Sequence, residues 1–252
     1  METYTRPITV ITGGSRGIGA ATAIRLARAG HDLAIAYRHD DAAAEDLANL
    51  VTAQGVRCVL VRADVARDDD VQRLFAVATE QLGPVTGLVN NAGLTAHIGD
   101  LVDTPVQVIQ RVIDVNLLGV VLCARRAAQL MSVRRAGRGG AIVNVSSSAA
   151  TLGSAHEYVH YAAAKAAVDT FTVGLAKELA DDKIRVNAVA PGIVRTRIHA
   201  DAGDPDRAER LAGRIPLGRA GEPDEIASAI AWLLGPEASY VTGAVLRAAG
   251  GM

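Results

Sequence analysis

The 252-residue sequence predicts a single-domain, doubly wound α/β fold, in which a parallel sheet of about seven strands carries helices on both faces. Short apolar runs rich in β-branched residues alternate with helical patterns along the whole chain. Several of these runs are uniformly apolar, as are strands that a parallel sheet buries on both faces. No repeat or linker interrupts residues 1–252, so we expect one domain.

The first half of the chain alternates strongly between the two patterns. The run 8–11 predicts a strand, which leads through a glycine-rich loop into a helical pattern ending near Arg28, before Gly30. Strands are then expected at 33–37, 56–61 and 87–90, separated by helices at 42–53 and 69–81. Asp40 and Asp41 precede the second helix and are predicted to cap it.

The second half begins with a long helix expected between 105 and 131. A strand at 142–145, an alanine-rich helix at 158–179 and a strand at 184–189 follow. A helix at 223–234 and a short strand at 244–246 complete the pattern. Helices 105–131 and 158–179 carry more apolar surface than one sheet can cover, so we expect a helix–helix contact between subunits.

Composition narrows the class of protein. Hydrophobic residues make up 50% of the chain and the net charge is -1, so the sequence suggests neither a nucleic-acid nor a membrane-surface partner. Cys58 and Cys123 both lie in apolar runs and are expected to be reduced core residues rather than a disulfide or a metal site. No apolar run has transmembrane length and METYTRPITV lacks a signal-peptide profile, so a soluble cytoplasmic protein is expected.

The glycine loop after the first strand predicts a dinucleotide site. Gly13, Gly17 and Gly19 stand between a strand and a helix, at the end of the sheet where ligands of such folds bind. Glycines allow the backbone to turn tightly and approach a pyrophosphate, and the start of the helix contributes free N–H groups and a favourable dipole. The spacing is G-x-x-x-G-x-G rather than the commoner G-x-G-x-x-G.

Polar or small residues follow three other predicted strands and should line the same crevice. Asp64 could accept a hydrogen bond from an adenine amino group, and Asn90-Asn91-Ala92-Gly93 could approach a ribose. Pro191-Gly192-Ile193-Val194-Arg195-Thr196 would offer backbone groups and the Thr196 hydroxyl to a nicotinamide amide. Turn chemistry alone could explain each motif, but their shared position at strand ends favours a binding site.

The segment 141–169 predicts proton-transfer chemistry. A strand runs into Ser146, Ser147 and Ser148, and Tyr161 and Lys165 lie four apart on the following helix, on one face. The pKa of a free phenol is about 10. A neighbouring ammonium should lower that pKa toward working pH, as a general acid–base requires.

Together these motifs make the chain resemble the classical short-chain dehydrogenases/reductases over essentially its whole length. The motifs are TGGSRGIG at 12–19, Asp64-Val65, NNAG at 90–93, Asn116, the strand-end serine, Tyr161-x-x-x-Lys165, PGIVRT at 191–196 and the tail from Tyr240 to Gly251. The resemblance implies a Rossmann-type fold, a homotetramer or homodimer, and an oxidoreductase acting on a small carbonyl or alcohol substrate.

The resemblance also implies individual roles. Tyr161 would be the general acid–base, Lys165 would lower its pKa and hold the nicotinamide ribose, the serine would hold the substrate oxygen, and Asn116 would help hold a water beside Lys165. Taken with the residue patterns, it predicts a cofactor site made of Gly13, Ser15, Arg16, Gly17, Ile18, Gly19, Arg38, Asp64, Val65, Asn91, Ala92, Gly93, Tyr161, Lys165, Pro191, Gly192, Ile193 and Thr196.

The catalytic serine has two candidates. Family members often place it thirteen residues before the tyrosine, which selects Ser148, whereas counting from the strand selects Ser147. Because a sheet fixes position better than a variable loop, Ser147 is the choice and Ser148 the alternative. Alternation along the extended chain also points Ser146 and Ser148 away from the side that Ser147 faces.

Substrate identity depends on segments 94–102, 149–160 and 197–217, the last within a polar stretch around 195–217 that should form a short helical lid. The candidate substrate contacts in these segments are His97, His156, Glu157, Tyr158 and His199.

Cofactor preference is predicted from the end of the second strand. Folds that prefer NAD carry an acidic residue there, but this strand ends in Tyr37-Arg38. The Arg38 guanidinium could bind a 2′-phosphate, and Arg16 could approach the same phosphate from the glycine loop. The sequence therefore predicts an enzyme that prefers NADP(H), with NAD(H) possible. The alternatives are a sugar dehydrogenase using either cofactor and a catalytically idle dinucleotide-binding sensor.

Overall fold

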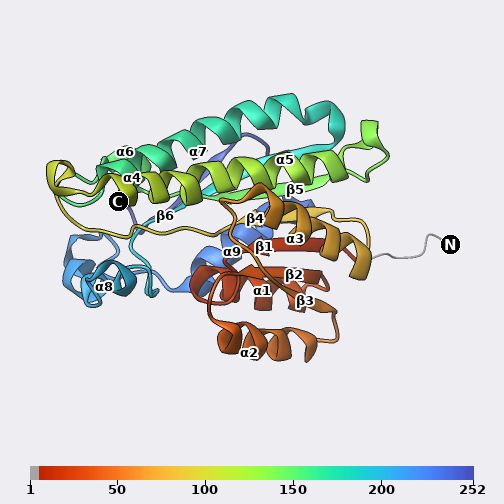
Figure 1. Ribbon diagram of the computed structural model, residues 1–252, viewed down its shortest axis with the longest axis horizontal. Helices are drawn as coiled ribbons and strands as arrows, with labels where there is room; N and C mark the ends of the chain where they lie inside the picture. The colour runs from red at the N-terminus through yellow and green to blue at the C-terminus, as the bar shows by residue number, and fades with distance from the viewer. Residues whose placement is uncertain (1–5) are drawn as a thin grey trace.

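The computed structural model describes residues 6–252 and contains a seven-stranded parallel sheet in the order β3-β2-β1-β4-β5-β6-β7 (Figure 1). Each strand pairs in parallel with its neighbour, so the predicted doubly wound fold is confirmed. The strands are β1 (Ile8–Thr12), β2 (Asp32–Tyr37), β3 (Cys58–Arg62), β4 (Gly87–Asn90), β5 (Gly140–Val145), β6 (Ile184–Pro191) and β7 (Val245–Ala248).

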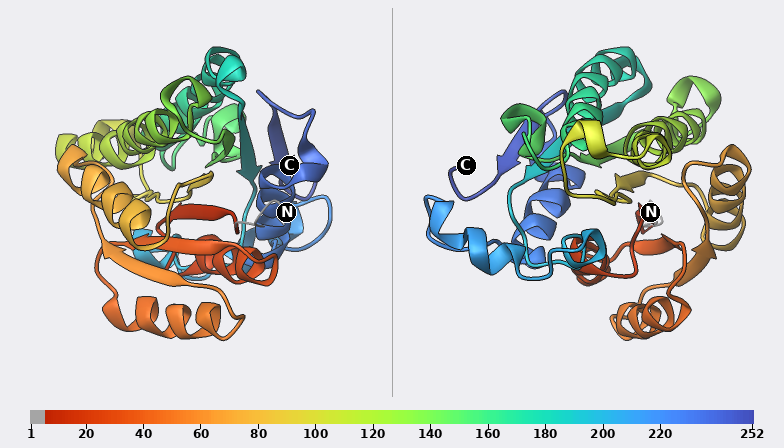
Figure 2. Two further views of the ribbon diagram at one scale, coloured as in Figure 1. Left: turned by 90° about the vertical axis from the view of Figure 1, so that its right-hand side faces the viewer. Right: turned by 60° about the vertical axis from the view of Figure 1, so that its left-hand side comes forward.

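Helices cover both faces of the sheet (Figure 2). One apolar core lies under α3 (Asp68–Gln81), α5 (Gly119–Met131) and α7 (Val159–Glu178). The other lies under α1 (Gly17–Arg28), α2 (Asp41–Thr52) and α9 (Pro223–Leu234). The ends of the elements differ from the predicted ends by at most two residues. The strand β3, for example, was expected from Val56 but begins at Cys58, because backbone pairing with β2 starts there, although Val56 is also buried.

The predicted long helix is continuous but changes its winding at the site. It consists of α4 (Val106–Ile113), a π-helical turn (Asp114–Leu118) that holds Asn116, and α5. A π-helical turn inside an α-helix is frequently found at a functional site. By length and composition Val106–Met131 could cross a membrane. The sequence had predicted no run of that length. One face of this helix, with Cys123, Ala127 and Met131, is fully buried in the core against the sheet.

The capping prediction is confirmed at Asp40, whereas Asp41 is the first residue of α2, and of the two predicted core cysteines Cys123 is buried and Cys58 is half-buried. The Asp40 side chain accepts a hydrogen bond from the backbone N–H of Ala43 at 3.1 Å, at the start of α2. Cys58 and Cys123 are both free thiols, and burial raises their pKa to about 11 and about 12. Neither thiol is therefore activated as a nucleophile.

A buried chain of polar side chains fixes the helix α7 against the centre of the sheet. Asn90 at the end of β4 donates to Asn144 Oδ1 on β5 at 2.9 Å, and Asn144 donates to Thr172 Oγ1 on α7 at 2.9 Å. All three side chains are almost completely buried. Because α7 carries Tyr161 and Lys165, this chain positions the candidate catalytic helix relative to the strand ends.

We predict that Asn144→Ala lowers the free energy of unfolding by about 1–3 kcal/mol, because the substitution removes one buried hydrogen bond from Asn90 and one from Thr172. Urea denaturation measures the change. The matched control is Asn49→Ala on the exposed face of α2, where a surface substitution should stay within about 0.5 kcal/mol. A loss at Asn144 as small as that of the control would contradict the positioning role of this chain.

Candidate functional site

A cleft of about 790 Å³ opens beyond the carboxyl ends of the strands. Its lining includes Arg207 and Leu211 of α8 (Arg207–Leu211) and Met252, and Figure 1 shows α8 and the C-terminus at the same end of the molecule. The predicted cofactor and catalytic residues that line it are Gly13, Ser15, Arg16, Gly17, Ile18, Arg38, Asp64, Val65, Asn91, Ala92, Gly93, Ser147, Tyr161, Lys165, Pro191, Gly192, Ile193 and Thr196. Gly19 and Asn116 lie behind the lining and support it.

The glycine loop is shaped by close backbone approaches. Gly13 has a φ of 60°, and a Cβ there would lie 2.8 Å from Ala92 Cα. Gly17 has a φ of 55°, and a Cβ there would approach Thr196 Cγ2 to 3.3 Å. A Cβ on Gly19 would meet the Gly13 carbonyl oxygen at 2.4 Å, so Gly19 permits the turn rather than lining the cleft.

The start of α1 fits the phosphates of a dinucleotide. No side chain caps this terminus, and its first turn carries no acidic residue. Its N–H groups and dipole therefore favour an anion. The Asn91 amide donates to the carbonyl oxygens of Thr12 and Gly13 at 3.0 and 2.8 Å, which holds the loop in place. These residues fit the cofactor that the glycine spacing predicts.

The two arginines expected near a 2′-phosphate occupy different surroundings. Arg38 is half-exposed and its Nε lies 3.5 Å from Asp64 Oδ2. Arg16 lines the cleft, but its Nη2 lies 2.6 Å from Asp201 Oδ2 in the segment 195–217. Both side chains are 49% exposed and lie beside a carboxylate, but the Arg38–Asp64 pair is the longer one, so Arg38 is the less tightly paired of the two.

Asp64 is held by an arginine that sequence reasoning missed. Arg111 on α4 donates to Asp64 Oδ2 at 2.8 Å, and the Ala66 N–H donates to Oδ1 at 3.1 Å. Burial raises the pKa of this carboxyl, but the bonds from Arg111 and Ala66 outweigh burial and keep it below its usual value. Asp64 is therefore an ionised acceptor at the cleft wall, and no sequence pattern marked Arg111 as its partner.

Tyr161 and Lys165 meet at the floor of the cleft, as their spacing predicts. The Lys165 Nζ lies 5.6 Å from the centroid of the Tyr161 ring and donates to the Val145 carbonyl oxygen at 2.8 Å. The Ser147 hydroxyl faces Tyr161 closely enough to lower the pKa of the phenol. The structure therefore brings together a phenol, an ammonium and a hydroxyl, the groups needed to hold and move one proton.

The expected direction of the Tyr161 pKa is wrong in this structure. Complete burial raises the pKa of Tyr161, and the Ser147 hydroxyl only partly offsets that effect. Burial also lowers the pKa of Lys165 to about 8, although Asp169 opposes the shift. Desolvation disfavours the charged form of both groups, and here it exceeds the attraction that the spacing alone suggested.

The three serines have distinct positions. Ser147 meets Tyr161, and its Oγ also accepts the Ala149 N–H at 3.1 Å. Ser146 is buried and its Oγ donates to the Lys165 carbonyl oxygen at 3.3 Å, away from the phenol. Ser148 is buried, and its backbone N–H donates to the Pro191 carbonyl oxygen at 2.8 Å. Ser147 thus stays the predicted catalytic serine and Ser148 the alternative, since both line the cleft.

Asn116 supports the site through hydrogen bonds to the backbone of the loop that follows β4. Its amide donates to the carbonyl oxygens of Leu94 and Val112 at 2.8 and 2.9 Å, and its Oδ1 accepts the Leu94 N–H at 3.3 Å. A Cβ on Gly93 would lie 2.8 Å from Asn116 Oδ1 and 3.6 Å from Lys165 Nζ. Asn116 therefore fixes the loop after β4 close to Lys165.

The predicted substrate segments surround the outer part of the cleft. Glu157, Tyr158 and His199 line it, whereas His156 is exposed and bonds Asp100 at 2.8 Å, and His97 lies outside the lining. Within these segments Ala96, Ser154 and His156 have left-handed φ angles, which marks locally strained backbone of the kind found at functional sites. The lining also includes Arg207, Leu211 and Arg214 of the predicted segment 197–217, and Tyr37, His39 and Met252, which the sequence did not single out as contacts.

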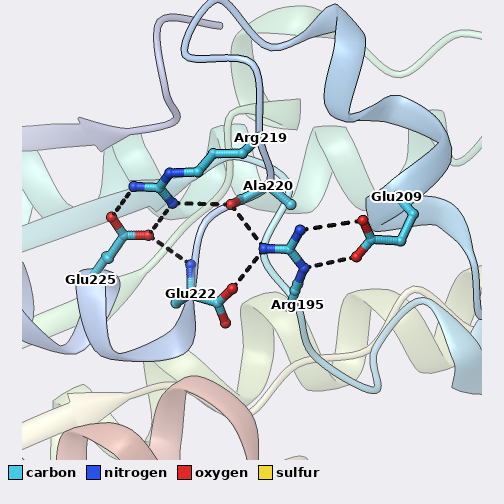
Figure 3. Close-up of polar contacts among 6 residues, drawn as sticks. All are labelled: Arg195, Glu209, Arg219, Ala220, Glu222 and Glu225. Atoms are coloured by element: carbon cyan, nitrogen blue, oxygen red, sulfur yellow. Dashed lines mark hydrogen bonds and ion pairs between the residues drawn. The ribbon is translucent and has the colours of Figure 1, made fainter.

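The segment 195–217 contains the short helix α8 and is anchored by charged side chains (Figure 3). Arg195 binds Glu209 on α8 at 2.8 Å and Glu222 before α9 at 2.6 Å. Arg219 binds Glu225 through two bonds of 2.7 and 2.6 Å. Arg195, part of the predicted PGIVRT motif, therefore holds the segment to α9 and does not line the cleft.

Comparison with known proteins settles the family. The protein-family model described as "Enoyl-(Acyl carrier protein) reductase" matches residues 13–252. The chain belongs to the short-chain dehydrogenase/reductase family. It is 44% identical to the uncharacterized oxidoreductase YgfF of Escherichia coli, over 97% of this chain and 99% of that protein.

Two further relatives bear on the cofactor of this short-chain dehydrogenase/reductase. The L-rhamnose 1-dehydrogenase (NAD(P)(+)) of a Sphingomonas species is 40% identical over 96% of this chain and 94% of that protein. A short-chain dehydrogenase from Burkholderia cenocepacia, solved in complex with NADP, superposes with a TM-score of 0.89 at 32% identity, covering 99% of both chains. The chain is therefore an oxidoreductase with a nicotinamide dinucleotide site.

Burial of Lys165 predicts a pH-dependent contribution to stability. Its pKa is about 8 when folded against 10.5 for the free group, so the unfolded chain binds more protons between these values and stability rises with pH there. Relative to Lys165→Met, the parent should gain about 2–3 kcal/mol of unfolding free energy between pH values of about 7 and 10. Urea denaturation of the cofactor-free proteins at both pH values measures the gain. Lys177→Met, at an exposed position of the same helix, should show no such gain, and a parent that behaves in the same way would contradict the burial argument.

Proposed function

We propose that this protein is an NADP(H)-dependent oxidoreductase that interconverts an alcohol, a secondary alcohol above all, and the corresponding ketone or aldehyde. The observation that carries the proposal is the contact of Ser147 with Tyr161 beside Lys165, in a cleft that also contains the glycine loop. The bound nicotinamide supplies the hydride chemistry. The chain's own residues orient the substrate oxygen and deliver its proton.

In this proposal Tyr161 is the general acid–base. Because burial keeps its phenol protonated, Tyr161 is poised to donate a proton to the substrate oxygen during reduction. Ser147 holds that oxygen, and the Lys165 ammonium stabilises the phenolate left on Tyr161 and binds the ribose hydroxyls. Asn116 holds the loop next to Lys165 and helps to retain a water there.

The NADP(H) preference follows from charge at the end of β2. Ala36 and Tyr37 stand where an NAD-preferring fold places a carboxylate, and the half-exposed Arg38 lines the cleft beside them. A phosphate there would meet a guanidinium able to bind it through two hydrogen bonds. Arg16 contributes only if it exchanges Asp201 for the phosphate.

A sugar dehydrogenase that uses either cofactor is the second candidate. It is favoured by the 40% identity to a named L-rhamnose 1-dehydrogenase (NAD(P)(+)). The same Tyr161, Lys165 and Ser147 would serve that reaction, run in the oxidative direction.

The proposal includes a soluble, cytoplasmic homotetramer or homodimer that pairs through the helices α4, α5 and α7. Leu118, between α4 and α5, and Val173, on α7, are exposed apolar side chains that a subunit contact would cover. Light scattering at micromolar concentration measures the mass directly.

Tyr161→Phe should reduce turnover by at least about a hundredfold while NADPH still binds, because the variant loses the proton donor and keeps the ring. Steady-state kinetics at 340 nm and a cofactor titration measure the two effects. Ser147→Ala should be strongly impaired, and Ser148→Ala should remain close to the parent. Turnover of Tyr161→Phe within about tenfold of the parent would remove Tyr161 from this role, and the reverse order for the serines would select Ser148.

Arg38→Asp should shift preference from NADP(H) toward NAD(H), because a carboxylate repels the 2′-phosphate and accepts the 2′-hydroxyl. The measurement is the ratio of kcat/KM for the two cofactors in parent and variant. Arg28→Asp, on the exposed end of α1 and outside the cleft lining, is the control. A parent that favours NADH, or a ratio that does not respond at Arg38, would show that the 2′-phosphate is not recognised at this residue.

A further inference from the structure

Tyr158 is fixed directly beside the proposed proton donor. Its ring packs edge to face against Tyr161, with centroids 5.3 Å apart and an interplanar angle of 84°. Both rings belong to a small apolar cluster with Val112, Ala149 and Ala162, separate from the two main cores. Tyr158 also lines the cleft, so a substrate that reaches Tyr161 also meets Tyr158.

Arg207 on α8 determines what the Tyr158 hydroxyl can do. Arg207 Nη2 donates to Tyr158 Oη at 3.1 Å and to Glu157 Oε1 at 2.6 Å, and its guanidinium carbon lies 5.4 Å from the Tyr158 ring centroid. A guanidinium has no acceptor atom, so Tyr158 must be the acceptor in this bond. The phenol therefore keeps its own proton for another partner, and the bond from a cation makes that proton a better donor.

We propose that Tyr158 is a second substrate-binding hydroxyl, which donates a hydrogen bond to an oxygen that the substrate carries next to its reacting carbonyl. Arg207 is its positioning residue. This inference rests on the proposed function and specifies its substrate class as vicinally oxygenated compounds, such as 1,2-diketones, hydroxy ketones and the diols formed from them. The ring centroids lie 5.3 Å apart, and this closeness favours two oxygens on neighbouring carbons of the substrate.

The local charge favours a neutral oxygen over a carboxylate. The Arg207 side chain is 5% exposed and already lies 2.6 Å from Glu157 and 3.7 Å from Asp204. Glu157 and Asp204 thus both face this buried cation, Asp204 being shared with Arg210, and an anionic substrate group would have to displace one of them. A carbonyl or hydroxyl oxygen can instead accept the Tyr158 proton without disturbing the pair.

The test compares two probes that differ by one oxygen, butane-2,3-dione and butan-2-one, each reduced with NADPH. Tyr158→Phe removes only the hydroxyl. It should lower kcat/KM for the dione by about tenfold, the value of one good hydrogen bond, and leave kcat/KM for butan-2-one within about twofold. Arg207→Met should reproduce this selective loss. Arg210→Met is the control, because Arg210 lies on the same helix, is 56% exposed and pairs with Asp204 instead of Tyr158.

The outcomes separate this inference from the proposed function. Equal losses of kcat/KM on both probes in Tyr158→Phe, or no loss on either, would overturn the role of the second hydroxyl. Tyr161→Phe should lose activity on both probes in either case. If the parent reduces neither probe, binding of the dione to the NADPH-loaded protein is followed by quenching of cofactor fluorescence. A dione affinity equal in the parent and in Tyr158→Phe would then overturn the inference, whichever substrate the enzyme turns over.

Discussion

The parallel direction of all seven strands is the constraint on which the rest of the molecule depends. It brings every strand's carboxyl end to one edge of the sheet, and the order reverses there between β1 and β4. The glycine loop, Asp64, the loop after β4, the serines and the loop after β6 consequently meet in one cleft. Segments far apart in the chain therefore contribute to one site, because the carboxyl ends of their strands lie side by side along this edge of the sheet.

Burial is the second physical effect that governs the site. The environment that excludes water from Tyr161 and Lys165 also destabilises the charged form of each, so an isolated view of the pair as phenolate and ammonium is incorrect. The Val145 carbonyl and Asp169 partly offset this cost for Lys165. In the cofactor-free protein the phenol therefore retains its proton.

The sequence was sufficient for features that local patterns encode. Strand ends, the glycine loop and the four-residue spacing of Tyr161 and Lys165 depend on neighbours in the chain, and counting from the strand gave the serine that meets Tyr161. Contacts between distant segments could not be predicted. Arg111 meets Asp64 across 47 positions, Arg207 meets Tyr158 across 49, and Arg16 meets Asp201 across 185. The direction of the Tyr161 pKa was missed for the same reason, since it depends on how many distant residues cover the ring.

The way in which the segment 195–217 is attached affects how this protein can change over evolutionary time. Ala208, Ile215 and Ala220 form their own small apolar cluster with Ile193 and Met252, and the charged network of Figure 3 ties the segment to α9. Neither of the two large cores passes through it. Substitutions in the segment can therefore reshape the wall of the pocket at little cost to the sheet. A gene duplicate could acquire a new specificity through this one segment and inherit the proton-transfer apparatus intact.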